Sequence, residues 1–475
     1  MGPSPTTIGR RAGSPEVSVP QIRPFRALRF DPAVVGDPAL VVAPPYDVIG
    51  DAERERLMTR HPANVVRLDL PVEAAGDEPD DRYRRAARIL AGWRSDGTLR
   101  KDPHPSVYVY EQTYRVPDTT VERTQRGFFA RLRLESFGPG SGVLPHERTL
   151  SGPKEDRYKL LRATGVNTSP VVGLFDDASG AAGSALAAIT VGGPAAIDVL
   201  DDDGVRHRLW ALPADGEGEQ ADRAAALIAL ASVGPITIAD GHHRYETALR
   251  YRDERRMSRT CEEDPAFDYL LMLFLEASAE PLTVLPTHRL VRGLGDAAGT
   301  LVERARELFE VTEVGSAEEL ASRFPGVGLA RGGEGRFGLW TRRGGALLTA
   351  RPEAFQPYLP AGGDALRGLD VTLLGVALER LAGIDASALE AGAVAYTKSA
   401  VEALAAVEAG ASVIEAGAST AAGEGLAGVD AAFLLEGTPV ASISAVARAG
   451  DVMPQKSTYF YPKALTGLLI NPHEW

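Results

Sequence analysis

The stretch that most constrains the fold is residues 236–249, with the sequence ITIADGHHRYETAL. It begins with alternating β-forming residues and continues into a run of helix-forming composition, so it predicts a strand, a turn and a helix in succession. The turn, DGHHR at residues 240–244, falls where a strand ends and a helix begins. Unpaired N–H groups and the positive end of the helix dipole make such a junction a common anion-binding site. A plain tight turn with surface histidines is the alternative interpretation.

Each residue of this turn suits phosphate binding in its own way. Gly241 permits a positive φ or close backbone approach, and Arg244 can offer a phosphate two parallel hydrogen bonds. The rings of His242 and His243 add donors. Asp240 can orient a substrate hydroxyl or bind a metal ion. We therefore assign phosphate binding to residues 241–244, and we place Asp240 and His243 among the candidate catalytic residues.

Composition argues against several classes of function. The 475 residues suffice for two or three domains, and a net charge of −13, from 64 acidic and 51 basic residues, disfavours nucleic-acid binding. The single cysteine, Cys261, cannot form an intramolecular disulfide, which fits a reducing cytoplasm. No apolar run approaches the ~18 residues that a membrane span needs. We expect a cytoplasmic protein without nucleic-acid or membrane partners, whose oligomeric state stays open.

The order of the predicted elements indicates a mixed α/β or α+β fold. Residues 107–116 and 125–134 predict an antiparallel hairpin, and the apolar residues 269–276 predict a central strand. Short strands are also predicted at residues 40–43 and 65–70. We divide the chain into a disordered leader (1–20), an α/β core with the DGHHR turn (21–295) and a C-terminal α/β lobe that ends in MPQKSTYFYPK (296–475).

Further polar residues stand at predicted strand ends, stiff turns or glycine-flanked loops. They are Asp47 after Pro44-Pro45, Ser151 and Lys154 at a Ser-Gly turn, His288 and Arg289 at a second strand end, and Lys456 in the tail motif. Rigid sheets commonly carry their ligand residues at such places, and a bound polyphosphate would relieve the repulsion among gathered cations. We therefore predict one pocket with the DGHHR turn as its floor. Local alternatives are an Asx-turn, solvated lysines, a backbone-bonded imidazole and a packed tail strand.

Five motifs along the chain resemble one known family. They are APPYDVI (43–49), HERTLSGPK (146–154), the DGHHR turn, PTHRL (286–290) and MPQKSTYFYPK (453–463). On these motifs the chain is identified as a member of the family numbered 1015 among the domains of unknown function. The GHHRY segment (241–245) is also similar to the Gly-X-His-Arg turn of the ParB/sulfiredoxin superfamily, above all to its free serine kinases. This resemblance implies a ParB/sulfiredoxin-like nucleotide-binding core within a larger mixed sheet.

The leading hypothesis is a phosphotransferase that uses ATP or ADP with Mg²⁺ and acts on a small hydroxylated metabolite, with a free amino acid such as serine as the best candidate. Such chemistry depends mainly on positioning and charge. Asp47 is the candidate general base because it stands on a rigid loop, and Asp240 is the candidate metal ligand. Ser151, Lys154, His288, Arg289 and Lys456 would assist the turn in binding the phosphates. The chain lacks a Walker A pattern, so it is not a P-loop enzyme.

Two other classes of function stay open. A nucleotide-dependent switch or ParB-like DNA-binding protein is disfavoured by the acidic balance and by the lack of a clear helix-turn-helix after the turn. A metal-dependent hydrolase would use His242, His243 and Asp240, with His146 or His288 as a further ligand, although adjacent histidine side chains usually diverge. Sulfiredoxin chemistry is set aside because it needs a catalytic cysteine where this chain has His242.

Overall fold

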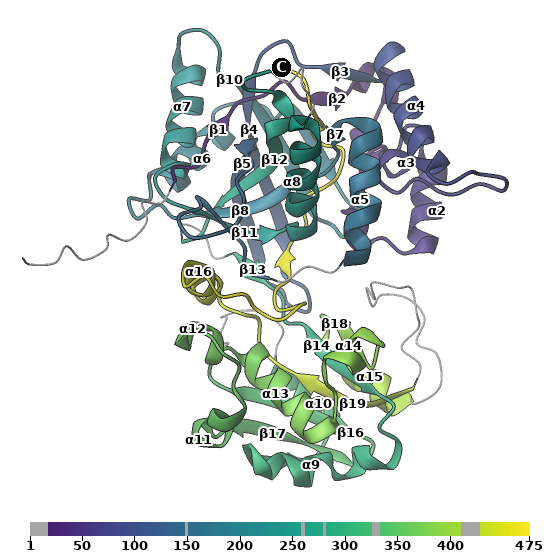
Figure 1. The fold of residues 1–475 in the computed structure, drawn as a ribbon, viewed down its shortest axis with the longest axis vertical. Coiled ribbons are helices and arrows are strands. Elements are labelled where there is room, and N and C mark those ends of the chain that lie inside the picture. The colour runs from purple at the N-terminus through teal and green to yellow at the C-terminus, as the bar shows by residue number, and fades with distance from the viewer. Residues whose placement is uncertain (1–17, 148–150, 258–261, 279–281, 325–332, 410–427) are drawn as a thin grey trace, which may run out of the picture.

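The computed structural model of the protein describes residues 18–147, 151–257, 262–278, 282–324, 333–409 and 428–475, with the backbone alone at residues 151–153. Figure 1 shows two bodies, one above the other, each built around a sheet. The C-terminal tail, drawn in yellow, runs from the lower body into the upper one (Figure 1). The predicted mixed α/β class is confirmed. Most of the predicted leader lies outside the described residues.

The upper body contains a nine-stranded mixed sheet. Its order is β6 (Val143–Leu144), β11 (Ile236–Asp240), β8 (Val171–Phe175), β12 (Tyr269–Glu276), β5 (Glu122–Arg133), β4 (Ser106–Arg115), β10 (Arg206–Pro213) and β9 (Ile197–Leu200), and β1 (Ile22–Arg23) pairs with β5. The predicted hairpin is confirmed, since β4 and β5 pair antiparallel. Strand β12 runs parallel to β8 and antiparallel to β5, as expected for a central strand of a mixed sheet.

Helices cover one face of this sheet. Those of the upper body are α1 (Pro32–Val35), α2 (Asp51–Arg60), α3 (Val66–Asp69), α4 (Asp81–Ser95), α5 (Ser151–Thr164), α6 (Ala181–Val191), α7 (Glu219–Ala231) and α8 (His242–Arg256). Alternate residues of β12 point to opposite faces. Leu270 and Met272 share a core with residues of α6, α7 and α8, whereas Leu271 and Leu273 share another core with residues of the tail such as Leu465. The tail therefore covers the face that these helices leave open.

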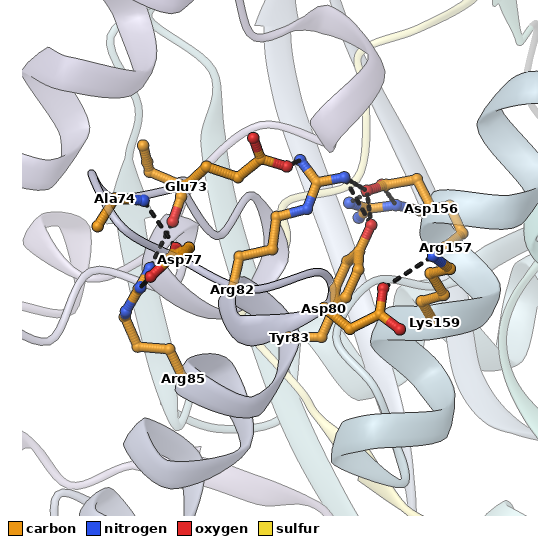
Figure 2. Close-up of polar contacts among 11 residues, drawn as sticks. Glu73, Ala74, Asp77, Asp80, Arg82, Tyr83, Arg85, Asp156, Arg157 and Lys159 are labelled. Atoms are coloured by element: carbon orange, nitrogen blue, oxygen red, sulfur yellow. Dashed lines mark hydrogen bonds and ion pairs between the residues drawn. The ribbon is translucent and has the colours of Figure 1, made fainter.

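A polar network fixes α5 against α4 (Figure 2). Asp156 on α5 accepts a hydrogen bond from the Tyr83 hydroxyl at 2.7 Å and pairs with Arg157 at 2.6 Å. The Arg157 guanidinium in turn lies 4.3 Å from the centre of the Tyr46 ring. Tyr46 opens the short 3₁₀ turn η2 (Tyr46–Val48), so the network holds in place a loop that carries a candidate site residue.

The lower body contains a six-stranded sheet and most of the remaining helices. The strand order is β15 (Phe309–Val314), β17 (Gly344–Ala350), β16 (Arg336–Thr341), β19 (Val429–Leu434), β14 (His288–Arg292) and β18 (Val394–Thr397). The helices are α9 (Leu301–Arg304), α10 (Ala317–Ser322), α11 (Pro352–Phe355), α12 (Asp364–Arg367), α13 (Asp370–Ala382), α14 (Ala386–Glu390), α15 (Ala400–Ala409) and α16 (Val440–Arg448). This sheet has its own topology, separate from that of the upper body.

The last part of the chain joins the two bodies. Strand β20 (Phe460–Tyr461) pairs with β13 (Thr283–Val284), and β21 (Asn471–Pro472) pairs with β7 (Val166–Asn167). Single bridges join Thr466 to Ala43 and Ile470 to Leu28, and Leu28 lies in β2 (Leu28–Phe30), the partner of β3 (Leu99–Lys101). The division of the chain at residues 295 and 296 stays a prediction.

Two predicted strands near the N-terminus are wrong. Residues 65–70 form the short helix α3, and residues 40–43 form the end of a 3₁₀ turn followed by one bridge at Ala43. Asn64 explains both, because its side chain accepts a hydrogen bond from the Val66 N–H at 3.0 Å and donates to the Leu40 carbonyl at 2.8 Å and to the Val42 carbonyl. A side chain that satisfies helix-start and loop backbone groups overrides the β preference of valine.

Candidate functional site

The central turn is a strand, a glycine and a helix, as predicted. Strand β11 ends at Asp240, Gly241 adopts φ +90°, and α8 begins at His242. A Cβ atom on Gly241 would lie only 3.0–3.1 Å from atoms of the Arg244 guanidinium. Glycine is therefore required here both for the backbone angle and because the Arg244 side chain folds back over it.

Arg244 forms hydrogen bonds within the protein, and most of its side chain is shielded from solvent. Its Nη1 donates to the Pro170 carbonyl and its Nη2 to Asp240 at 3.1 Å, and 12% of the side chain is exposed. Lys463 from the tail is a second cation on Asp240, at 3.4 Å. Although burial alone would raise the pKa of Asp240, Lys463 and Arg244 hold it well below its usual range. Asp240 is thus an ionised and compensated carboxylate.

The two histidines of the turn point to different surroundings. His242 is buried, and its Nε2 accepts a hydrogen bond from the His146 N–H at 3.2 Å. Burial and the neighbouring His146 lower the pKa of His242, so it is neutral near pH 7. His243 is half-buried, and its pKa is lowered by burial and by Lys154. His242 therefore supports the fold, while His243 faces the charged groups around the turn.

His146 connects the turn to the tail. Its Nδ1 donates to the Ile238 carbonyl, which leaves Nε2 to accept from the Thr458 hydroxyl at 3.1 Å. Burial lowers the pKa of His146 to about 4. The carbonyl of His146 also accepts from the Met453 N–H at 2.7 Å, and Glu147 forms a bridge with Met453. The tail motif is therefore fastened beside the central turn.

Sequence analysis did not assign a role to Glu147, and the structure draws attention to it. Its Oε1 accepts a hydrogen bond from the Lys456 N–H at 3.1 Å. Burial raises the pKa of Glu147 to about 7, against the opposing effect of Lys456 and Lys463. A carboxyl group with a pKa near neutrality is suited to accept a proton in a reaction. The sequence signal was the position of Glu147 in the motif HERTLSGPK.

Lys398 was missed, whereas Lys463 lies in the tail motif that the sequence had singled out, and the two lysines meet at one aromatic ring. The Lys463 Nζ lies 4.3 Å from the centre of the Tyr459 ring, and the Lys398 Nζ lies 4.4 Å from the same centre. Lys463 belongs to the tail, whereas Lys398 follows β18 in the lower body. Tyr459 therefore contacts one cation of the tail and one of the lower body, and the tail cation Lys463 also pairs with Asp240.

The second His-Arg pair lies at the start of β14, whereas the prediction put it at the end of the preceding strand. His288 is fully buried, and its Nδ1 accepts from the Leu435 N–H at 3.3 Å. Burial lowers the pKa of His288 to about 3, so it is a neutral core group, in line with the backbone-bonded alternative. Arg289 is buried too, and its Nη2 donates to the Lys456 carbonyl at 3.3 Å, which places it beside the tail.

The remaining candidates surround the turn. Asp47 is exposed on η2. Burial lowers the pKa of Arg244, but the negative charges of Asp240 and Asp47 raise it. Lys154 forms an ion pair with Glu246 on α8 and lowers the pKa of His243. The structure thus gathers Asp47, Lys154 and the turn with Lys456 of the tail. The Ser151 side chain lies outside the described residues. The assigned roles stay predictions.

The space inside the site is small. A cavity of about 50 Å³ adjoins Arg244, and Asp69 and Arg157 also line it. A second cavity, of about 10 Å³, is lined by Asp240 and Lys463. Cavities of these volumes have room for water molecules but not for a nucleotide. In the described parts of the chain, no group of three or more His, Cys, Asp and Glu residues is placed to hold a metal ion.

A family model described as "Protein of unknown function (DUF1015)" matches residues 22–372. The chain belongs to this family. The membership inferred from the five motifs is thereby confirmed. A comparison with curated proteins gives no match. Over the described residues, none of the helices is long and apolar enough to cross a membrane.

Solved structures similar to this family member show only distant likeness. A conserved hypothetical protein from Pyrococcus furiosus is 16% identical with a TM-score of 0.31, over 67% of this chain and 87% of that chain. A free serine kinase in complex with AMP is 15% identical with a TM-score of 0.32, over 69% and 89%. SbnI from Staphylococcus aureus is 7% identical with a TM-score of 0.31, over 70% and 84%. Likeness at this level does not transfer the ligands of those proteins to this chain.

Proposed function

We propose that this protein transfers a phosphoryl group from ATP or ADP to the hydroxyl group of a small metabolite. The observation that carries the proposal is the position of Glu147, a carboxyl group whose burial raises its pKa to about 7 among Lys456, Lys463 and Asp240. A proton acceptor surrounded by cations matches the needs of phosphoryl transfer, which depends on charge stabilisation and positioning. The similarity of the GHHR turn to that of free serine kinases also supports it.

Glu147 replaces Asp47 as the proposed general base. Asp47 is exposed, whereas Glu147 is partly buried and hydrogen-bonded to the Lys456 N–H at 3.1 Å. In the reaction, Glu147 takes the proton of the acceptor hydroxyl while the hydroxyl oxygen forms a bond with the terminal phosphorus. The bond from that phosphorus to its bridging oxygen breaks, and the electron pair leaves with the shortened nucleotide. Glu147 later releases the proton to water.

The cations around Glu147 would stabilise the phosphate charges. Lys456 is exposed, and its charge opposes the rise in the pKa of Glu147. His243 is half-buried with Lys154 and Lys456 as charged neighbours. Arg244 contributes indirectly, because it is bonded to Asp240 and Pro170 and fixes the shape of the turn.

Mg²⁺ fits the carboxylates of this site. Mg²⁺ in phosphoryl-transfer enzymes is usually bound by one or two carboxylates together with substrate phosphates. Asp47 is exposed, and Asp240 shares its charge between Arg244 and Lys463, so Asp47 is the more available of the two. The ion would supply charge neutralisation on the transferred phosphoryl group.

A direct test is to incubate the full chain with Mg²⁺, ATP or ADP and a pool of hydroxylated metabolites. A new phosphorylated compound, detected by phosphorus NMR and mass spectrometry, is the expected result, and the Glu147→Gln variant should not produce it. A Glu155→Gln variant, which removes an exposed carboxylate that pairs with Arg250, is the matched control and should be as active as the wild type. The proposal fails if no nucleotide is consumed with any acceptor, or if Glu147→Gln is as active as the wild type.

A further inference from the structure

The contact region between the start of β14 in the lower body and the tail contains a buried cation, Arg289, without an ion pair among the described residues. Arg289 is 5% exposed. Its guanidinium donates to the carbonyls of Thr287 and Lys456 and lies 5.6 Å from the centre of the Tyr396 ring. Throughout the part of the chain that the structure describes, Arg289 has no ion pair with an acidic side chain.

Lys398 adds a second cation at the same place. Its Nζ donates to the Thr287 hydroxyl at 2.8 Å and lies over the Tyr459 ring. Thr287 thus contacts both cations, since its carbonyl accepts from Arg289. Burial, Lys456, Arg289 and Lys463 lower the pKa of Lys398, while Glu147 alone opposes them. Arg289, Lys398 and Lys456 therefore act on the carboxyl group of Glu147, whereas Lys463 is paired with Asp240.

Burial by itself does not distinguish Arg289, as two other buried arginines show. Arg157 pairs with Asp156 at 2.6 Å and with Asp69 at 3.4 Å. Among the described residues Arg131 has no ion pair, but it donates to three oxygens, and the charge of Glu474 raises its pKa against the effect of burial. The charge of Glu147 also acts on Arg289, but unlike Arg157 and Arg131, Arg289 shares that carboxyl group with a second cation, Lys398. Such concentration of like charge is unfavourable until an anion joins it.

Resting on the proposed function, we propose that Arg289 and Lys398, assisted by Lys456, bind an oxyanion of the phosphoryl acceptor, which is therefore a small hydroxylated acid. An arginine fork and a lysine are the usual partners of carboxylate and phosphate oxygens. The same groups could receive a phosphate of the nucleotide, so the test must separate the two sources.

The location of the two cations favours the acceptor. Arg289 and Lys398 belong to β14 and the end of β18 in the lower body, whereas the DGHHR turn belongs to the upper body. Glu147 lies between them, joined to the tail through the Lys456 N–H. With the nucleotide phosphates on the turn side, an acid group on the other side of Glu147 would direct the acceptor hydroxyl towards the proposed base.

Binding of an oxyanion at this site should also change the protonation of Lys398. Without an anion, burial and the surrounding cations lower the pKa of Lys398. A bound oxyanion would favour the charged amine, so the protein should take up protons as it binds. The groups that face Lys398 are Lys456, Arg289, Lys463 and Glu147, together with the Thr287 hydroxyl and the Tyr459 ring. Glu147 can also take up a proton, so wild type and Lys398→Met must be compared.

The experiment is calorimetric binding to the full chain, in buffers of different ionisation enthalpy. The probes are L-serine, L-threonine, D-glycerate and glycolate, each beside its amide, and separately MgADP. We expect an acid to bind the wild type and its amide to bind at least tenfold more weakly. We expect Lys398→Met to weaken binding of that acid about tenfold, or about 1.4 kcal/mol, with reduced proton uptake and little change for MgADP.

Two controls keep the outcome decisive. Lys159→Met removes a lysine that pairs with Asp80 at 2.8 Å on the outer surface of α5 (Figure 2), and it should bind like the wild type. Thermal unfolding should show that Lys398→Met is folded. Loss of MgADP affinity with unchanged acid affinity would assign the cations to the nucleotide and overturn the proposal, as would equal binding of acids and amides or no acid binding. Absence of a phosphorylated product alongside acid binding that needs Lys398 would refute the proposed function only.

Discussion

The two His-Arg pairs of this chain look alike in sequence and differ in charge balance. In the first pair, Arg244 is bonded to Asp240 at 3.1 Å and to the Pro170 carbonyl. In the second, Arg289 donates to two carbonyl groups and lies near an aromatic ring, and it shares the charge of Glu147 with Lys398. The histidine that precedes Arg289 is buried in the core, whereas the one that precedes Arg244 is half-buried. The first arginine has an ion pair with a carboxylate, whereas among the described residues the second has none and shares the charge of Glu147 with Lys398.

This difference assigns the two regions different tasks. A buried ion pair that is complete in the folded protein fixes the local structure, and its loss leaves an unpaired charge. A buried cation without an acidic partner lowers stability until an anion arrives. We therefore infer that the Arg244 region shapes the site, and that the Arg289 region binds part of a ligand. Glu147 lies between them and provides the largest expected effect.

The Glu147→Gln substitution should reduce the rate of phosphoryl transfer by at least about 100-fold, because general base catalysis contributes roughly 10²–10⁴. Single-turnover measurement with saturating nucleotide isolates this step. Binding of MgADP should change little. If Glu147→Gln has nearly normal turnover, another group accepts the proton, and Glu147 does not link the two arginine regions.

The raised pKa of Glu147 also predicts opposite effects of pH on activity and stability. Burial raises this pKa from 4.5 to about 7, so the base form, and with it the rate, is lost as pH falls through about 7. The folded protein binds this proton more tightly than the unfolded chain does. The stability due to this group is therefore fully present below pH 4.5 and is lost as pH rises through about 7. Urea unfolding of wild type and Glu147→Gln across this range measures the difference.

The next largest effect concerns the stability of the two arginine regions. Arg244→Met should destabilise the unliganded protein by about 2–3 kcal/mol, because it removes charge-assisted hydrogen bonds to Asp240 and Pro170. Arg289→Met should cost less than about 1 kcal/mol, since the lost hydrogen bonds are offset by the removal of an uncompensated charge. Urea unfolding at low salt provides both values. Equal losses in the two variants would contradict the proposed difference between the pairs.

The sequence predicted the local structure of the site better than its contacts. The strand, turn and helix around Asp240 follow from residue spacing, and the motif MPQKSTYFYPK (453–463) pointed to the tail. The meeting of Lys463 with Asp240 depends on a tail that returns across the upper sheet, and no local pattern reports this. The same holds for Lys398, which reaches Tyr459 from the lower body.

Arg244 shows why a correct local prediction gave an incomplete account of its contacts. The sequence indicated an arginine at a helix start, which is a plausible open fork for phosphate. Its actual acceptors include the Pro170 carbonyl, which lies 74 residues earlier in the chain. Similarly, residues 65–70 favour a strand by composition, but Asn64 stabilises a helical turn there. Tertiary hydrogen bonds decide both cases.

A smaller effect tests whether the Arg244 side chain depends on the glycine beneath it. Gly241→Ala should destabilise the protein by about 1–2 kcal/mol, because φ is +90° and the new Cβ would lie 3.0 Å from the guanidinium. Gly375→Ala is the matched control, since this exposed glycine in α13 has open space around it. The control should stabilise by roughly 0.5–1 kcal/mol. If Gly241→Ala and Gly375→Ala changed the stability equally, the turn would tolerate a side chain at residue 241.

The smallest expected effect is the stabilisation of the Arg289 region by an added anion. Inorganic phosphate should stabilise the wild type by about 1 kcal/mol or less at concentrations near its dissociation constant, as expected for a weak ligand of the folded state. Lys398→Met should lose the part of this stabilisation that the Arg289 region contributes, and it should be no less stable than wild type without phosphate, because Lys398 lies among Lys456, Arg289 and Lys463. Arg244→Met should keep the phosphate response despite its lower stability, because Arg244 is bonded to Asp240 and Pro170.

Thermal unfolding at constant ionic strength, with chloride in place of phosphate as the reference, separates a bound anion from general screening. A phosphate response that disappears with Arg244 and persists without Lys398 would reverse the tasks assigned to the two regions.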